Sequence, residues 1–108
     1  MTAETFVALQ DDGPDLIFQG ILLAEVNNRP ADSELNTHTS KWIELSLYRT
    51  AGGQFVCERG HCSAQPEPDH YDAAICADEA GVIAFFGYDR LSKELFDIAE
   101  IDASQCVH

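Results

Sequence analysis

The chain has few cationic side chains. Six Lys and Arg residues stand against 19 Asp and Glu residues, which gives a formal net charge of −13, and the lysines are limited to Lys41 and Lys93. A surface of this kind repels nucleic acids and anionic membranes and attracts basic protein surfaces. We therefore expect a protein partner with a basic surface, and neither direct nucleic-acid binding nor membrane binding.

Long apolar runs are also missing. The longest apolar stretch, around residues 21–24, is far shorter than the ~20 residues that a membrane-spanning helix needs. The start of the chain, MTAETFVALQDDG, lacks the basic and apolar regions of a secretory signal. The sequence predicts a cytoplasmic protein with one domain over residues 1–108, because a chain of this length can bury a core without disulfides.

Familiar catalytic motifs are absent as well. The sequence contains no G-x-S-x-G, no P-loop, no H-E-x-x-H and no G-x-G-x-x-G, which are the local patterns of several hydrolase, nucleotide-binding and zinc-protease sites. A pair of carboxylates is not diagnostic, since 19 acidic residues always offer one. We therefore expect neither an enzyme nor a cofactor.

The hydrophobic pattern predicts strands in the first part of the chain. In residues 42–50, Ile43, Leu45 and Leu47 alternate with polar and aromatic residues, which is typical of a strand with one buried face. Gly52 and Gly53 predict a turn that returns the chain over residues 54–59. Residues 16–26 and 71–76 are further candidates, and residues 5–9 form either a short strand or a frayed lead-in.

Two helices are predicted in the last part. Asp78 is a suitable N-cap for a helix that ends near Phe86, with Gly87 following it, and Asp89 is the N-cap of a second helix. The fold class is therefore α+β, with a three- or four-stranded antiparallel sheet followed by two short C-terminal helices packed on one face. Trp42 and Tyr48 share a strand face that either forms an interface or is covered by these helices, and we favour cover by the helices.

Residues 57–76 gather three of the four cysteines and two of the four histidines. A structural zinc site needs four such ligands, and Cys57, Cys62, His70 and Cys76 could supply them in the alternative function, a zinc- or thiol-dependent module. A Cys57–Cys62 disulfide and a nucleophilic Cys62 beside His61 are further alternatives. Because free cysteine is among the most buried residue types, we favour ordinary structural cysteines.

The acidic residues are concentrated in the two flanks of the chain. Residues 1–40 hold seven acidic residues and one basic residue, and residues 67–108 hold ten acidic and two basic residues. Some of these acids have a local role at helix N-termini or in pairs four residues apart. The acids without such a role are the predicted partner-binding set, namely Asp11, Asp12, Asp15, Glu67, Asp69, Asp72, Glu100 and Asp102.

Two segments, KWIELSLY at residues 41–48 and FFGYDRLSKELF at residues 85–96, resemble those of small acidic proteins from phages and mobile elements, of the anti-CRISPR type. The resemblance implies an inhibitor that binds a nucleic-acid-handling complex, in some cases as a DNA mimic. Duplex DNA carries one charge per ~1.7 Å, so the charge of −13 corresponds to roughly 22 Å of duplex. Improved solubility and adaptation to a salt-rich habitat remain alternative reasons for the acidity.

Overall fold

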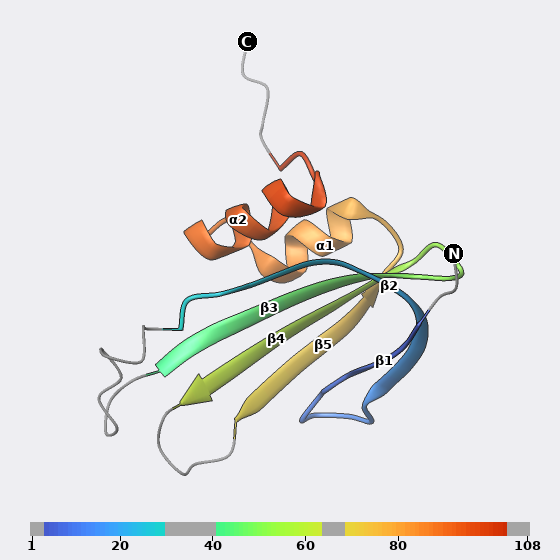
Figure 1. Cartoon of the computed structure of the whole chain (residues 1–108), viewed down its shortest axis with the longest axis horizontal. Helices are drawn as coiled ribbons and strands as arrows, with labels where there is room; N and C mark the ends of the chain where they lie inside the picture. The colour runs from blue at the N-terminus through green and yellow to red at the C-terminus, as the bar shows by residue number, and fades with distance from the viewer. Residues whose placement is uncertain (1–3, 30–40, 64–68, 104–108) are drawn as a thin grey trace.

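The computed structural model describes residues 4–29, 41–63 and 69–103. This part of the chain forms an α+β fold in which two helices follow an antiparallel sheet (Figure 1). The elements in chain order are β1 (Glu4–Ala8), β2 (Leu16–Asn27), β3 (Lys41–Thr50), β4 (Phe55–Ser63), β5 (His70–Cys76), α1 (Glu79–Phe86) and α2 (Arg90–Ala99).

The sheet is an antiparallel meander with the order β1-β2-β3-β4-β5. Its five strands correct the prediction of three or four, because residues 4–8 pair with β2 as a strand in their own right. β4 is longer than predicted and continues to Ser63, so that Trp42 lies opposite Cys62. The β3–β4 register also places Cys57 opposite Leu47, on the same face of the sheet.

Both predicted helix caps are confirmed. The Asp78 carboxylate accepts a hydrogen bond from the Gly81 amide at 3.0 Å, and the Asp89 carboxylate accepts one from the Ser92 amide at 2.8 Å. Gly87 ends α1 with φ of 83°, a conformation that glycine adopts without strain. Neither of the two described helices is long and apolar enough to cross a membrane.

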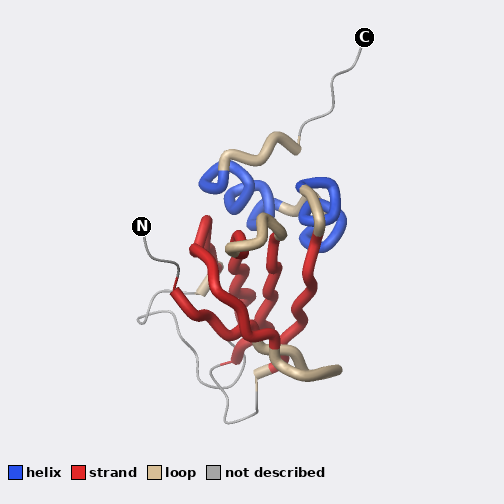
Figure 2. The backbone as a smooth tube through the Cα atoms, turned by 90° about the vertical axis from the view of Figure 1, so that its right-hand side faces the viewer, coloured by secondary structure: helices blue, strands red, loops and turns tan. Residues whose placement is uncertain are grey.

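The two helices cover one face of the sheet, which we call the helix face. Figure 2 shows both helices on the same side of the strands. Leu45, Leu47 and Cys57 from the strands pack there with side chains from α1 and α2, including Val82 and Leu95, and all five are almost fully buried. The predicted stacking of both helices on one face is therefore correct.

The opposite face carries Trp42, Glu44, Ser46 and Tyr48. We predicted that the helices cover this face, and that prediction is wrong. The β1–β2 hairpin folds over it instead, so we call it the hairpin face (Figure 1). The ring centroid of Phe6 lies 4.8 Å from that of Tyr48. A second, smaller core of aromatic and aliphatic side chains therefore lies between the hairpin and β3 and β4.

Two features of β2 accompany this folding of the hairpin over the sheet, which we call the curl of the sheet. Gly20 lies so close to β3 that a Cβ atom there would stand 2.1 Å from the Arg49 carbonyl oxygen. A β-bulge follows between Leu22 and Ala24, and bulges bend and twist strands. The bulge also changes the phase of the strand, which directs Ala24 to the helix face and Glu25 to the hairpin face.

Candidate functional site: an acidic cavity

A cavity of about 270 Å³ opens on the hairpin face, and residues from or next to all five strands line it. Glu25, Glu44 and Glu58 supply carboxylates from β2, β3 and β4. Hydroxyl groups come from Ser46, Tyr48 and Tyr71, and apolar groups come from Val7, Leu9 and Val26. We call this feature the acidic cavity.

Strand register brings the three carboxylates together. Ser46 pairs with Glu25 on one side and with Glu58 on the other, so these three residues form one row across the sheet. Glu44 lies two positions before Ser46 on β3 and therefore on the same face. Side chains on neighbouring positions of one sheet face lie within reach of each other, so the three carboxylates are close together.

Two of the carboxylates are held in place by hydrogen bonds. The Leu9 amide donates to Glu58 Oε2 at 2.6 Å, which ties the end of the hairpin to β4. The Trp42 indole Nε1 donates to Glu44 Oε2 at 3.0 Å. These donors leave further acceptor positions on both side chains, because each carboxylate has about four lone-pair sites.

The surroundings of the acidic cavity disfavour negative charge. Burial raises the pKa of Glu58, the Leu9 hydrogen bond lowers it, and the nearby charges of Glu25, Glu44 and Asp15 raise it again. Burial, Cys62, Asp69, Glu44 and Glu58 raise the pKa of Tyr71 to about 12. The pKa of Tyr48 is also raised, chiefly by burial and then by Glu58. A cation that enters the cavity would relieve this repulsion.

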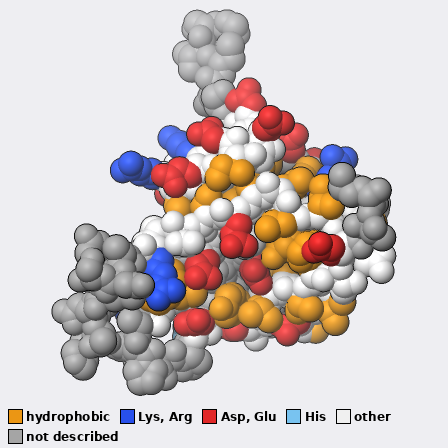
Figure 3. Space-filling model, viewed as in Figure 1, with side chains coloured by type: hydrophobic (Ala, Val, Ile, Leu, Met, Phe, Trp, Pro, Cys, Tyr) orange, Lys and Arg blue, Asp and Glu red, His pale blue; other side chains and the backbone are white. Residues whose placement is uncertain are grey.

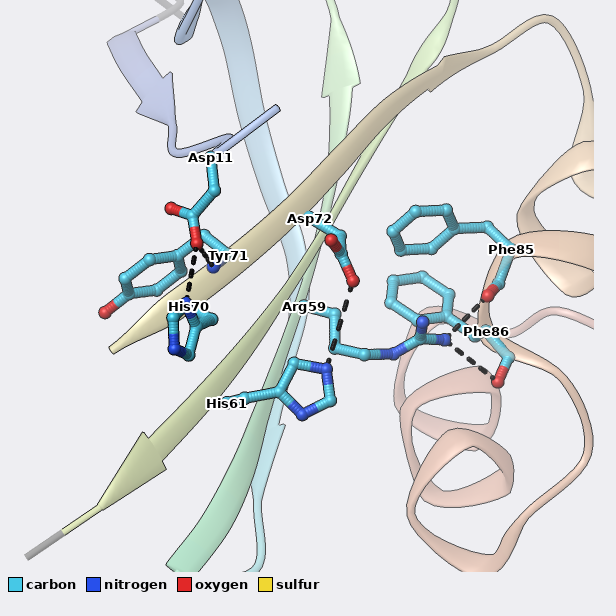
Figure 4. A network of polar contacts seen from close by, with 8 residues as sticks. All are labelled: Asp11, Arg59, His61, His70, Tyr71, Asp72, Phe85 and Phe86. Carbon is cyan, nitrogen blue, oxygen red and sulfur yellow. Dashed lines mark hydrogen bonds and ion pairs between the residues drawn. The ribbon is translucent and has the colours of Figure 1, made fainter. Parts of the chain in front are cut away.

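The predicted partner-binding acids separate into groups. Asp11 lies against the start of β5, where its Oδ2 atom is 3.1 Å from His70 Nδ1 and accepts from the Tyr71 amide at 3.1 Å (Figure 4). The Asp11 amide in turn donates to the Tyr71 carbonyl oxygen at 3.0 Å. Asp11 therefore closes the hairpin onto the edge strand, which is a structural role.

Asp69 and Asp72 lie at or next to β5 and contact different partners. Asp69 Oδ2 is 3.5 Å from the Tyr71 hydroxyl, and Asp72 Oδ2 is 3.9 Å from His61 Nε2 on the helix face. Asp12 and Asp15 lie in the exposed turn between β1 and β2, where Asp15 accepts from the Gln10 amide.

The remaining members of the set lie elsewhere or outside the described part. Glu100 ends α2 in a left-handed conformation with φ of 60°, and Asp102 follows it. Because these two residues come after α2, they are set apart from the acids at β5 and the hairpin. Glu67 is outside the described residues.

The proposed four-ligand cluster is not assembled. Cys57 packs in the core of the helix face, whereas Cys62 lies five positions further along β4 and therefore points to the opposite face. Cys57 is instead 3.8 Å from Cys76, measured between the sulfur atoms. Among residues 4–29, 41–63 and 69–103, no group of three or more His, Cys, Asp or Glu side chains is arranged to hold a metal ion.

The alternation of β4 also separates Cys62 from His61, the pair considered as an alternative nucleophile and base. Consecutive strand residues point to opposite faces, so His61 cannot activate its neighbour Cys62. Burial, together with the charges of Glu44 and Asp69, raises the pKa of Cys62 to about 11. The Cys62 sulfur is therefore a protonated thiol at neutral pH. The alternative of a Cys57–Cys62 disulfide is excluded, because the two side chains lie on opposite faces of β4.

Several basic residues are engaged with groups other than carboxylates. Arg59 donates to the Phe85 carbonyl oxygen at 2.6 Å and its guanidinium lies 4.9 Å from the Phe85 ring centroid (Figure 4). Arg49 lies over the Phe55 ring at 6.0 Å. In the face shown in Figure 3, acidic side chains spread across the surface and the basic side chains lie towards its margins. Arg59 and Arg49 therefore contact a backbone carbonyl oxygen and aromatic rings.

The sequence did not identify Glu25 and Glu58 as site residues, and Glu44 was predicted only as part of a strand face. The alternation of residues 42–48 already indicated that Glu44 shares a face with Ser46 and Tyr48. Glu25 gave no such signal, because the bulge in β2 reverses its facing. Glu58 depended on the length of the turn before β4, which a pattern with period two does not fix.

No protein-family model, curated protein sequence or solved structure matches this chain. We therefore infer a function from the residues and geometry of this chain alone.

Proposed function

We propose that this protein is an acidic interaction module that binds a basic, nucleic-acid-binding surface of a partner protein and blocks it. The acidic cavity is the observation that carries this proposal, because three carboxylates from three strands converge in it. The binding face therefore includes Glu25, Glu44 and Glu58 in addition to the predicted Asp15 and Asp69.

The size and lining of the cavity favour a basic side chain as its occupant. Its volume of about 270 Å³ is below the ≈ 300–1,000 Å³ of typical small-molecule pockets. The apolar groups of Val7 and Leu9 suit the methylene stem of an arginine or lysine, and the carboxylates suit its charged end. Tyr71 adds a partly exposed aromatic ring, which attracts cations, and Tyr48 adds its hydroxyl group.

The consequence for the partner is competition with nucleic acid. A basic surface that accepts phosphates also accepts carboxylates, since both form charge-assisted hydrogen bonds with arginine. Occupation of that surface by an acidic protein prevents DNA or RNA from binding there. This is the mode of action implied by the resemblance to anti-CRISPR proteins, and the cytoplasm is its proposed location.

The test compares two variants that lose the same charge at different places. Glu25→Gln/Glu44→Gln removes two charges from the acidic cavity and keeps side chains that accept hydrogen bonds. Glu100→Asn/Asp102→Asn removes two charges after α2, and asparagine tolerates the left-handed conformation of residue 100. The two pairs can be tested separately, because Glu100 and Asp102 come after α2 and lie apart from the cavity strands.

Each protein is immobilised and exposed to a bacterial lysate at low and moderate salt, and the retained proteins are identified by mass spectrometry. We expect one nucleic-acid-binding partner to be retained by the wild type, to be lost at higher salt and to be displaced by duplex DNA. The cavity variant should lose it, while the variant after α2 should retain it. Equal loss from both variants, or retention of general basic proteins alone, would show that bulk charge rather than this site is responsible.

A further inference from the structure

Two thiols meet on the helix face. Cys57 lies in β4 and Cys76 is the last residue of β5, and both are free cysteines. The β4–β5 register pairs Cys57 with Ala74 and Cys76 with Phe55, so the cysteines are diagonal neighbours on the same face. Their sulfur atoms are 3.8 Å apart, and rotation of the side chains must bring them to the ~2.05 Å of a disulfide.

The environments of the two thiols differ. Cys57 is 0% exposed within the main core, and burial together with the neighbouring Cys76 raises its pKa. Cys76 is only partly buried and lies beside the first turn of α1, where a Cβ atom on Gly81 would stand 3.1 Å from the Cys76 Cβ atom. An oxidant from solvent therefore reaches Cys76 first, because reactivity requires access as well as a thiolate.

We propose that Cys57 and Cys76 form a reversible disulfide when the protein meets a peroxide. Peroxide oxidises the Cys76 thiol to a sulfenic acid and is itself reduced, releasing one water. The Cys57 sulfur then attacks the Cys76 sulfur and forms the S–S bond. The sulfenic hydroxyl leaves with the proton of Cys57 as a second water. The two thiols together lose two electrons, which the peroxide accepts.

The disulfide would join β4 to the end of β5 at the base of α1. A cross-link of this kind lowers the conformational entropy of the unfolded chain, and for a loop of about 20 residues the expected rise of the melting temperature is about 15 °C. The acidic cavity lies on the opposite face of the sheet, so this inference does not depend on the proposed function.

The experiment uses the full chain in a Cys106→Ser background, because residue 106 is outside the described part. In this background, Cys62→Ser is the matched control that leaves the pair intact, and Cys76→Ala removes the partly buried partner. Each protein is treated with hydrogen peroxide, its remaining thiols are alkylated under denaturing conditions, and it is digested with trypsin without reduction. Cleavage after arginine leaves Cys57 in peptide 50–59 and both Cys62 and Cys76 in peptide 60–90.

We expect peptides 50–59 and 60–90 to be linked in the Cys62→Ser protein and unlinked in the Cys76→Ala protein. The melting temperature should rise on peroxide treatment, return on addition of dithiothreitol, and stay constant in the Cys76→Ala protein. Sulfinic or sulfonic acid at Cys76 without a link would overturn the proposal. Recovery of both Cys57 and Cys76 as alkylated thiols, which the peroxide had not oxidised, would also overturn the proposal.

Discussion

At the scale of single residues, Glu58 is the side chain with the most consequential environment. It is partly buried, it accepts a hydrogen bond from the Leu9 amide, and it faces Glu25 and Glu44. Its pKa is raised above the ordinary carboxyl value of 4.5. The folded state therefore holds more protons than the unfolded state above that pH, so this residue makes the free energy of unfolding fall as pH rises through the raised pKa.

We predict that Glu58→Gln stabilises the protein at neutral pH, because the amide oxygen still accepts from Leu9 while the repulsion is removed. The stability gained over the wild type should be smallest below the ordinary pKa of 4.5, should grow as the pH rises through the raised pKa of Glu58, and should then stay constant. Urea unfolding across this range measures the difference. Glu4→Gln, at the exposed start of β1, is the control, and a gain for Glu58→Gln that does not change with pH would contradict the prediction.

At the scale of elements, local signals were sufficient for some features and not for others. Asp78, Asp89 and Gly87 identified both helices correctly, because a cap acts within a few residues of the chain. The curl of the sheet has no such local signal. It accompanies a bulge near Leu23 and a close approach at Gly20, and for this reason the hairpin rather than the helices covers Tyr48.

The acidic cavity escaped prediction for the same physical reason. Its carboxylates come from three strands, and their meeting depends on register between strands rather than on spacing within one strand. Glu25 in particular reaches the cavity only because the bulge changes the phase of β2. The predicted partner-binding acids were chosen because they have no partner nearby in the sequence. Asp11 nevertheless accepts a hydrogen bond from the Tyr71 amide in β5, which is distant in sequence.

We predict that Gly20→Ala separates β2 from β3. The new Cβ atom would lie 2.1 Å from the Arg49 carbonyl oxygen and 2.9 Å from the Thr50 Cα atom, and these backbone atoms cannot move aside. Overpacking of this kind is expected to lower the free energy of unfolding by about 3 kcal/mol. Urea unfolding of the purified variant measures this loss.

Gly52→Ala is the matched control for that substitution. Its nearest neighbour would be the Thr50 hydroxyl oxygen at 3.8 Å, which is an ordinary contact. Its effect should therefore remain within about 0.5 kcal/mol. If both variants were equally stable, the close approach of β2 and β3 at residue 20 would not be a requirement of the fold.

At the scale of the whole molecule, the charge must be gathered in one place to imitate nucleic acid. The molecule extends over 41 Å along its longest axis, so 13 net charges spread evenly would give about one charge per 3 Å, roughly half the density of duplex DNA. Convergence of Glu25, Glu44 and Glu58 in one cavity supplies a higher local density. The negative charges of these gathered carboxylates repel one another, however, and this repulsion has a measurable effect on stability.

We predict that salt stabilises the protein. From 0.01 M to 1 M salt the Debye length falls from about 30 Å to about 3 Å, which screens the repulsion among the acids. Screening also weakens favourable pairs, but an exposed pair such as Arg90–Glu94, at 3.9 Å, contributes little to stability. The midpoint of urea unfolding should therefore rise steadily with sodium chloride, starting from a protein that is already folded at low salt.

A variant with Glu4→Gln, Asp12→Asn and Asp97→Asn, three exposed positions in different elements or turns, should show a smaller rise, since it carries less repulsion to screen. A midpoint that falls with salt would mean that attractive pairs dominate the surface. A wild type that folds only in molar salt would assign the acidity to adaptation to a salt-rich habitat. Folding at low salt with a moderate rise is the behaviour required of an acidic surface that is kept for binding, because such a surface must be folded at the moderate salt at which charge-assisted binding is strong.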